Sequence, residues 1–402
     1  MAADPHNVVR LILPRPVPGH PGEEYRHAAE SLRQWQDEHI LVTDPAPALY
    51  LYEQSASSGQ DAGWVQRGLI GAIRLVPPEA GIVLPHEDVS PGPVAGRLAL
   101  MEETEANLEP IFLLYDGLND TGPAAGATSS IISQIAGSRQ ASPGREPLIS
   151  TRTSDGLQHR LWAITDPGDL AAIAADLAPR KALIADGHHR YAAYRKLQAH
   201  RRQAGDGAGP WDYGLALLVD SASYPPQIGA IHRVIPGLDV HHAAKLAASA
   251  FAVRALPGGL ENLPEGINAL TEASTSGPAF VLADEDSSYL VCQPDPAQAA
   301  AAMPPGRSAQ WQALPAAVLQ ELLITKVWNL TDDDETVRVV HHDAEAAVRT
   351  AQSAGGTAVL CSPMTPSEVY AVAARGEKVP RKSTSFAPKP RTGLVLRSFA
   401  QG

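Results

Sequence analysis

The residues best suited to chemistry surround one glycine in the stretch KALIADGHHRYAAYRK, at 181–196. Small apolar residues lead into Asp186 and Gly187, and two histidines and Arg190 follow directly. The apolar run predicts a strand and the residues after the glycine predict a helix, so these polar groups fall at a strand–helix junction. Many helices begin at a glycine, so the cluster of polar residues, not the glycine alone, indicates a functional site.

The chemistry that such a cluster favours is phosphate binding. A helix N-terminus attracts anions because its first N–H groups have no partner in the helix and its dipole is positive there. Gly187 lacks the Cβ that would keep a phosphate oxygen away, and it permits a positive φ. Arg190 offers a forked donor, while His188 and His189 add donors whose charge changes near neutral pH. Asp186 could hold a divalent cation or orient a hydroxyl group. Adjacent helical histidines point apart, so zinc is not expected.

A second motif, LPHEDVSPGP at 84–93, lies where a short predicted strand runs into a loop rich in proline and glycine. By itself this pattern is typical of a solvated loop. If Glu87 lies near Asp186 in space, one carboxylate could act as general base on a hydroxyl while the other binds metal. His86 and Asp88 are then candidates for contacts with the substrate.

A third motif, RKSTSFAPKP at 381–390, is the densest basic and hydroxyl-rich cluster in an acidic chain. It could be a solubilising tail, but the apolar GLVLRSF after it predicts that the segment packs back on the protein. A packed basic loop at 376–392 could close over an anionic ligand. Its candidate phosphate ligands are Lys382, Ser383 and Thr384, and its other cations include Arg381 and Lys389.

The overall composition is that of a globular protein with buried cores. The 402 residues suffice for two or three domains, and 44% of them are hydrophobic and 19% charged. The formal net charge of −12 offers no basic surplus for nucleic acid. The two cysteines, Cys292 and Cys361, form no disulfide framework or zinc motif. Neither a signal peptide nor a membrane span is recognisable, so we expect a cytoplasmic protein. The oligomeric state stays open, with a homo-oligomer among the alternatives.

Strands and helices mix along the first part of the chain, which predicts an α+β fold. The run NVVRLILP at 7–14 predicts a strand, and 23–39 predicts an amphipathic helix. Two strands joined by a Ser/Gly-rich turn at 55–63 predict a hairpin. Residues 117–180 begin with a stretch rich in Gly, Ala, Ser and Pro and are interpreted as an insertion.

A change of pattern near IHRVIPGLD predicts a domain boundary. The first domain is expected to cover 1–235. The second, 236–402, alternates helices and strands and is predicted to be a smaller α/β domain that carries the basic loop.

Successive blocks of the sequence resemble the domain-of-unknown-function 1015 (DUF1015) family from residue 6 to the C-terminus. The blocks are PHNVVRLILP, ALYLYEQ, VLPHEDVSPGPVAGRLALMEETEANLEPIFLLYD, LIADGHHRYAAY, HRVI and GEKVPRKSTSFAPKPRTGLVLRSF. The chain lacks the Arg-Pro-Phe and Pro-Tyr-Asp-Val-Ile segments that are usual near the start of the family. Membership implies no settled activity.

A more distant resemblance is to free-serine kinases of the ParB/sulfiredoxin-like superfamily. These carry a Pro-His-Glu-acidic stretch, an Arg-Leu pair, a Pro-Ile strand and an Asp-Gly-His-His-Arg junction in that order. The matching residues are Pro85–Asp88, Arg97 with Leu98, Pro110 with Ile111, and Asp186–Arg190. About 70 residues separate the third and fourth motifs here, where the minimal core has a short connection.

This resemblance implies a nucleotide-binding core with insertions within 1–235, Mg²⁺ as cofactor, and ATP or ADP as phosphate donor to a small molecule such as free L-serine. By position, Glu87 would be the base and Asp186 a metal or catalytic residue. The phosphate cradle would be Gly187, His188, His189 and Arg190, with Arg97 nearby and His188 also a catalytic candidate. Two alternatives remain: a nucleotide-binding switch protein without turnover, and a metal-dependent phosphohydrolase.

Overall fold

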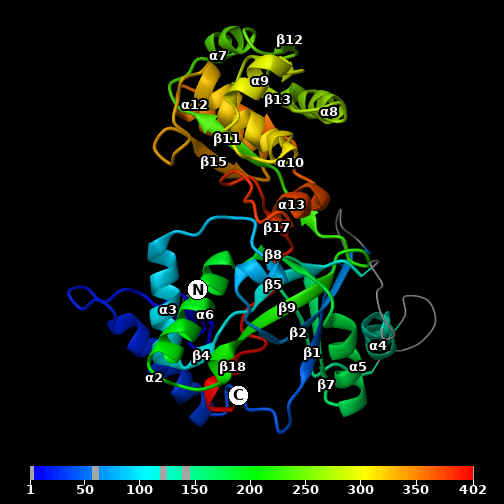
Figure 1. The fold of residues 1–402 in the computed structure, drawn as a ribbon. Helices are drawn as coiled ribbons and strands as arrows, with labels where there is room; N and C mark the ends of the chain where they lie inside the picture. The colour runs from blue at the N-terminus through cyan, green and yellow to red at the C-terminus, as the bar shows by residue number, and fades with distance from the viewer. Residues whose placement is uncertain (1–3, 57–62, 118–124, 138–144, 402) are drawn as a thin grey trace. The chain divides into compact units, whose positions relative to one another are not determined.

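The computed structural model describes all residues except 1–3, 57–62, 118–124, 138–144 and 402 (Figure 1). The chain divides into two compact units: unit 1 comprises Met1–Pro225 with Lys389–Gly402, and unit 2 comprises Pro226–Pro388. The sequence-based division instead placed the boundary after residue 235 and assigned the whole C-terminus to the second domain. In the structure the C-terminal segment Lys389–Gly402 belongs to unit 1, and with it the last part of the basic loop.

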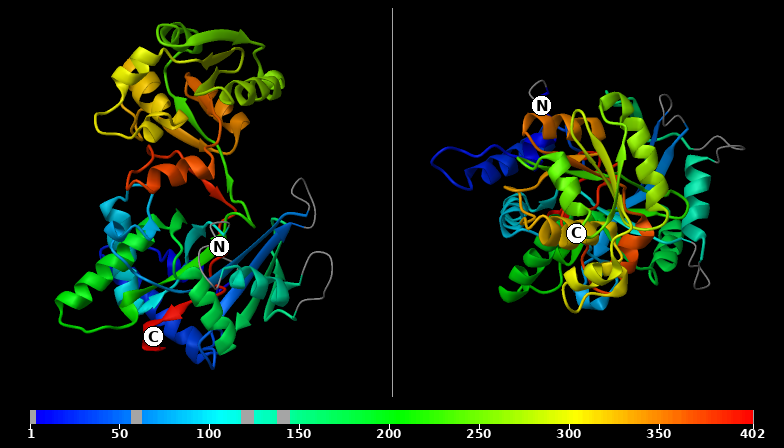
Figure 2. Two further views of the ribbon diagram at one scale, coloured as in Figure 1. Left: turned by 45° about the vertical axis from the view of Figure 1, so that its right-hand side comes forward. Right: turned by 90° about the horizontal axis from the view of Figure 1, so that it is seen from above.

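Unit 1 is built on an eight-stranded mixed sheet with the strand order β3-β8-β5-β9-β2-β1-β7-β6 (Figures 1 and 2). The pairs β3–β8 and β5–β9 are parallel, and the other neighbours are antiparallel. Its strands are β1 (Leu49–Ala56), β2 (Val65–Arg74), β3 (Val83–Leu84), β5 (Ile111–Tyr115), β6 (Ile149–Arg152), β7 (Leu157–Ile164), β8 (Ala182–Asp186) and β9 (Tyr213–Asp220). The predicted hairpin is β1 and β2, and residues 57–62 of its turn lie outside the described part.

Four helices cover one face of this sheet. Leu98 of α3 (Pro91–Thr104) and Tyr194 of α6 (His188–Gln203) pack in one apolar cluster with Leu113 of β5. A second cluster joins α4 (Ala127–Ala136) and α5 (Pro167–Leu177) to Leu69 of β2. Leu218 of β9 pairs with both Leu69 and Leu113. Because paired residues on neighbouring strands share a face, the two clusters lie on the same side.

The described part of the expected insertion is integral to unit 1. It supplies α4, α5, β6 and β7, and so contributes two strands of the sheet and the helices of one apolar cluster. Residues 118–124 and 138–144 of the insertion lie outside the described residues.

The expectation of a strand at 7–14 is wrong. Val9–Ile12 form a single helical turn, α1, with the Asn7 side chain accepting a hydrogen bond from the Val9 N–H at 3.0 Å. This turn buries Leu11 and Ile12 against α2 (Glu23–Asp37), which is the predicted amphipathic helix. The β-branched composition favoured a strand, but burial against α2 outweighs that weak preference.

The remaining elements of unit 1 are short. They are the 3₁₀ turns η1 (Pro78–Ala80), η2 (Pro210–Asp212) and η5 (Phe399–Gln401), and a two-residue ladder between β4 (Ala106–Asn107) and β18 (Arg397–Ser398). The β4–β18 pairing ties the C-terminal segment to unit 1.

Unit 2 has a separate six-stranded sheet with the order β12-β14-β13-β16-β11-β15, in which every neighbouring pair is antiparallel. An α/β domain was expected, and the alternation of helices and strands is present, but the antiparallel pairing makes the chain a mixed α+β protein. The strands are β11 (Ile231–Ile235), β12 (Ala252–Leu256), β13 (Ala279–Ala283), β14 (Ser288–Cys292), β15 (Arg338–His341) and β16 (Thr357–Cys361), with β10 (Gln227–Ile228) pairing separately with β17 (Phe386–Ala387). The helices are α7 (Val240–Ala247), η3 (Leu260–Asn262), α8 (Leu263–Ser274), α9 (Pro296–Ala302), α10 (Ala309–Gln312), α11 (Pro315–Ala317), the π-helix η4 (Val318–Val327), α12 (Ala344–Ser353) and α13 (Pro366–Ala373).

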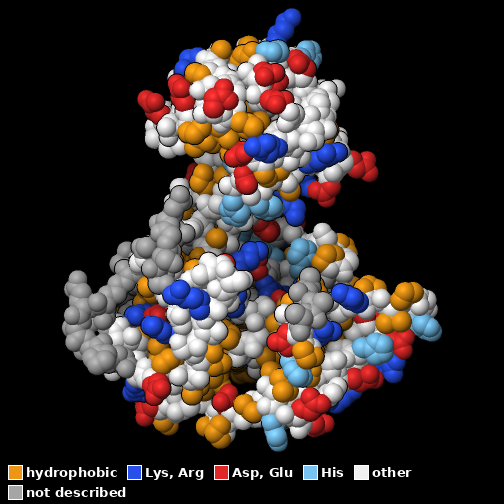
Figure 3. All heavy atoms as spheres, turned by 180° about the vertical axis from the view of Figure 1, so that it is seen from behind, with side chains coloured by type: hydrophobic (Ala, Val, Ile, Leu, Met, Phe, Trp, Pro, Cys, Tyr) orange, Lys and Arg blue, Asp and Glu red, His pale blue; other side chains and the backbone are white. Residues whose placement is uncertain are grey.

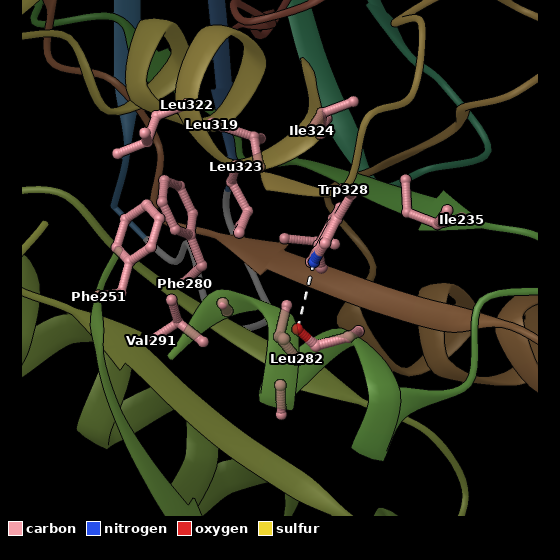
Figure 4. Close-up of a cluster of buried hydrophobic side chains, with 14 of the residues drawn as sticks. Ile235, Phe251, Phe280, Leu282, Val291, Leu319, Leu322, Leu323, Ile324 and Trp328 are labelled. Atoms are coloured by element: carbon pink, nitrogen blue, oxygen red, sulfur yellow. Dashed lines mark hydrogen bonds between the residues drawn. The ribbon is translucent and has the colours of Figure 1, made fainter. Parts of the chain in front are cut away.

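One apolar cluster of unit 2 lies between η4 and the sheet (Figure 4), and a second includes Leu270 of α8 and Val348 of α12. Leu322 and Leu323 of η4 are completely buried, as is Leu282 of β13. Beyond η4, the Trp328 indole N–H donates to the Ala243 carbonyl of α7 at 3.2 Å, which satisfies the indole's only polar group.

Within the described ranges, no helix is both long and apolar enough to cross a bilayer. On the face drawn in Figure 3, acidic and basic side chains are interspersed on both units. This mixture agrees with the acidic composition.

Replacing Leu323 tests the core. Leu323→Ala should lower the free energy of unfolding by about 2–5 kcal/mol, because a cavity forms where the side chain is fully buried. Leu148→Ala removes the same atoms from a side chain that is 61% exposed, and it should have a much smaller effect. Urea unfolding measures both, and equal losses would contradict the described core.

Candidate active site

The two sequence motifs meet at the start of α6. The main-chain N–H of His86 donates to Nε2 of His188 at 3.2 Å, and the N–H of Ser90 donates to Nε2 of His189 at 3.0 Å. The strands that precede the motifs, β3 and β8, are parallel neighbours, so both chains leave the sheet at the same edge. LPHED and ADGHHR, far apart in sequence, therefore form one site.

Gly187 is the N-cap of α6 and has the positive φ, 96°, that its sequence context allowed. A Cβ at this residue would lie 2.9 Å from Nε of Arg190 and 3.1 Å from Cγ2 of Ile111. Two features therefore favour glycine here. The backbone is left-handed, and the Arg190 guanidinium lies where a Cβ would be crowded. Arg190 is thereby held beside the positive end of the α6 dipole.

The hydrogen bond from His86 defines the protonation of His188. Because Nε2 of His188 accepts a main-chain N–H, its ring proton must be on Nδ1 if the ring is neutral. That Nδ1 lies 3.7 Å from Oε2 of Glu87. His188, which is 6% exposed, therefore directs an N–H toward the Glu87 carboxylate.

His86 forms the buried wall of the site. Its ring is fully buried and meets the His188 ring edge to face, with centroids 4.5 Å apart. Burial lowers the pKa of His86 to about 4, so this imidazole is neutral at pH 7. Nε2 of His86 lies 3.8 Å from Oε1 of Glu87. Glu87 is thus flanked by two histidines, while its own side chain is 34% exposed.

His86, Glu87 and His188 are also ligand types that a metal ion could use, and their ligand atoms lie within 4.8 Å of one another. A metal requires an imidazole lone pair. If Nδ1 of His188 supplied it, the ring proton would move to Nε2 and point at the His86 N–H. The geometry therefore favours an Nδ1–H of His188 directed at the Glu87 carboxylate over a transition-metal site.

A chain of ion pairs runs beside Gly187. Asp186 pairs with Arg190 through Oδ2 and with Nζ of Lys389 through Oδ1, the latter at 2.6 Å. Arg190 reaches Glu109 at 3.4 Å, and Arg97 reaches the same carboxylate at 3.3 Å. The structure thus brings the predicted residues Asp186, Arg190 and Arg97 into one network.

Sequence reasoning did not assign a role to Glu109. It directly precedes the Pro-Ile strand β5, which lies beside β8 in the sheet, and that position was the available signal. Lys389 was noted only as one cation of the basic loop.

The other predicted site residues are divided between the two units. Lys382, Ser383 and Thr384 belong to unit 2, whereas Lys389 belongs to unit 1, so the basic loop 376–392 is divided between the units. The Ser383 hydroxyl donates to the Pro380 carbonyl at 2.6 Å. Asp88 is exposed next to Glu87 in unit 1.

A model of the DUF1015 family, described as a protein of unknown function, matches residues 1–317. The chain belongs to this family. A search of curated proteins gives no match to this DUF1015 member.

Solved structures similar to this DUF1015 chain are distant relatives. A free serine kinase in complex with AMP is 15% identical with a TM-score of 0.37, and the match covers 79% of this chain and 87% of the other. SbnI with a C-terminal truncation, from Staphylococcus aureus, is 11% identical with a TM-score of 0.37, covering 80% and 84%. A conserved hypothetical protein from Pyrococcus furiosus is 15% identical with a TM-score of 0.35, covering 79% and 90%. At these values, function must be inferred from the site itself.

Gly187→Ala tests the close approach of Arg190. Gly22 also caps a helix with a positive φ, 89°, but a Cβ there would meet nothing within 4 Å. Gly22→Ala should therefore cost only the backbone strain, about 1–2 kcal/mol. Gly187→Ala should cost more, because Arg190 and Ile111 must also move. Equal losses in the free energy of unfolding would show that the described contact is absent.

The lowered pKa of His86 predicts a pH dependence of stability. The unfolded chain binds this proton near pH 6.5 and the folded chain only near pH 4. The free energy of unfolding should therefore fall as the pH drops from about 6.5 to about 4, and this contribution should level off below. His86→Gln should reduce that slope. His232 of unit 2, with a pKa also near 4 through burial, should preserve part of it. Identical slopes in urea unfolding of wild type and His86→Gln would contradict the assignment.

Proposed function

We propose that this protein is a nucleotide-dependent kinase that phosphorylates the hydroxyl group of a small metabolite, with free L-serine as the first acceptor to test. The observation that carries the proposal is the position of Glu87, whose carboxylate lies 3.7 Å from Nδ1 of the first residue of α6. A base beside an anion-binding helix terminus suits the transfer of a phosphoryl group to a hydroxyl.

The phosphate part of the site consists of α6 and Arg190. The helix has 16 residues, begins at a glycine with positive φ, and presents its positive end where Arg190 lies. Phosphoryl transfer needs little covalent help from the protein, so positioning and charge neutralisation dominate catalysis. A helix terminus with an adjacent guanidinium supplies both positioning and charge neutralisation.

The base is proposed to be Glu87. The Nδ1–H of His188 orients the Glu87 carboxylate. The fully buried, neutral ring of His86 closes the site on its inner side. Partial exposure of Glu87 leaves room for a hydroxyl substrate to approach from solvent, with exposed Asp88 as a candidate substrate contact. Glu87 would take the hydroxyl proton as the oxygen attacks the terminal phosphorus, and the bond to the bridging oxygen would break to release ADP from ATP or AMP from ADP.

The fit of Mg²⁺ depends on Asp186. Mg²⁺ prefers carboxylate and phosphate oxygens, but both Asp186 oxygens are paired with cations. Asp186 could serve as a ligand only after one of those cations has moved. When bound with a nucleotide, Mg²⁺ would neutralise charge on the transferred group.

The proposal also assigns a ParB/sulfiredoxin-like nucleotide-binding core to unit 1. The order of the motifs and the placement of LPHED and ADGHHR after two parallel neighbouring strands support this assignment. The phosphate role of Lys382, Ser383 and Thr384, which belong to unit 2, stays a prediction from the sequence.

A direct assay separates the kinase from its alternatives. The protein is incubated with Mg²⁺, ATP or ADP and a panel of hydroxy amino acids, and phosphorus NMR follows nucleotide and product together. A phosphorylated amino acid supports the kinase. Loss of nucleotide without such a product indicates a phosphohydrolase, and binding without turnover indicates a switch protein.

Glu87→Gln should lower kcat by about 10²–10⁴-fold, because it removes the base, and should leave nucleotide affinity nearly unchanged. Glu79→Gln is the matched control, since Glu79 is an exposed carboxylate of η1 outside the site. Arg190→Ala should show the converse pattern, with weaker nucleotide binding. If Glu87→Gln turns over at the wild-type rate, Glu87 is not the base.

A further inference from the structure

The C-terminal segment Lys389–Gly402 brings a lysine to the Gly187 junction. Lys389 is the first residue of this segment, and its Nζ lies 2.6 Å from Oδ1 of Asp186. We propose that Lys389 binds a nucleotide phosphate beyond the first, and that Asp186 holds the lysine until the nucleotide arrives. This inference deepens the proposed nucleotide site and rests on it.

The charges of the network favour an anionic ligand. Three cations, Arg97, Arg190 and Lys389, face two carboxylates, Asp186 and Glu109. One positive charge is therefore left over within the network, next to the positive end of α6. The outer phosphates of a nucleoside di- or triphosphate would compensate this surplus, whereas a neutral ligand would not.

Of the two cations on Asp186, Lys389 is the one suited to change partners. The Arg190 side chain is 15% exposed, contacts two carboxylates and lies against Gly187. The Lys389 side chain is 60% exposed and forms an ion pair with Asp186. An exposed lysine–carboxylate pair contributes little stability, and the long stem of lysine lets its ammonium group reorient.

The main chain around Lys389 is held in place while its side chain stays accessible. Two residues later, the Arg391 N–H donates to the Tyr52 hydroxyl at 3.3 Å, and the Arg391 side chain pairs with Asp155. Further along, Gly393 packs against Val8. Lys389 is thus kept beside Asp186 by contacts that a bound phosphate need not disturb.

Calorimetric titration of AMP, ADP and ATP into wild type and Lys389→Ala tests the inference. The variant should bind ADP and ATP about tenfold more weakly or worse, and AMP with little change, because the lysine contacts only the outer phosphates. Lys389→Arg should retain most of the affinity. The control is Lys196→Ala, which removes an exposed lysine of α6. It should bind AMP, ADP and ATP like wild type. Thermal unfolding confirms that each variant is folded.

Asp186→Asn tests the exchange of partners. In the presence of EDTA, the variant should bind ADP several-fold more tightly, because a carboxylate no longer competes for Lys389. The gain should disappear in Asp186→Asn combined with Lys389→Ala. Weaker ADP binding by Asp186→Asn would overturn the exchange.

The outcomes separate this inference from the proposed function. If wild type binds ADP and Lys389→Ala binds it equally well, or loses AMP and ADP affinity alike, the role of Lys389 is overturned and the nucleotide site remains. If wild type binds none of the three nucleotides, the proposed function fails and the inference fails with it.

Discussion

The hydrogen bond from the His86 main chain to His188 is the constraint on which the rest of the site depends. It joins the loop after β3 to the first turn of α6, and by occupying Nε2 it directs the proton of His188 toward Glu87. An N–H directed at a carboxylate orients it, as the role proposed for Glu87 as general base requires. The same bond makes the cluster a poor metal site.

Beside His188 and Glu87 lies a network of ion pairs. Asp186 and Glu109 each bind two cations, and the close approach of Arg190 to Gly187 depends on the absence of a Cβ. The two parts of the site therefore match two separate tasks of the proposed kinase. Glu87 is suited to accept the hydroxyl proton, and the network around Arg190 is suited to neutralise phosphate charge. The first turn of α6 carries both His188 and Arg190, so a change at the start of this helix would disturb both parts of the site.

The sequence was sufficient to predict the strand–helix junction at 186–190 and the helix at 23–39, because local pattern and turn chemistry determine these features. It misjudged 7–14, where burial against α2 outweighs β-branched composition. It also could not separate Lys389 from Lys382, because that division follows from the return of the chain to unit 1, a long-range contact with no local signal. Glu109 was missed although it directly precedes the Pro-Ile strand, because its ion pairs with Arg97 and Arg190 join separate segments.

The most direct test of the account is a crystal structure of the protein with ADP. The account predicts that the β-phosphate lies within hydrogen-bond distance of the first turn of α6 and of the Arg190 guanidinium, with the Glu87 carboxylate facing it across the space for an acceptor hydroxyl. An ADP molecule bound elsewhere, with Arg190 still paired only to Asp186 and Glu109, would contradict it.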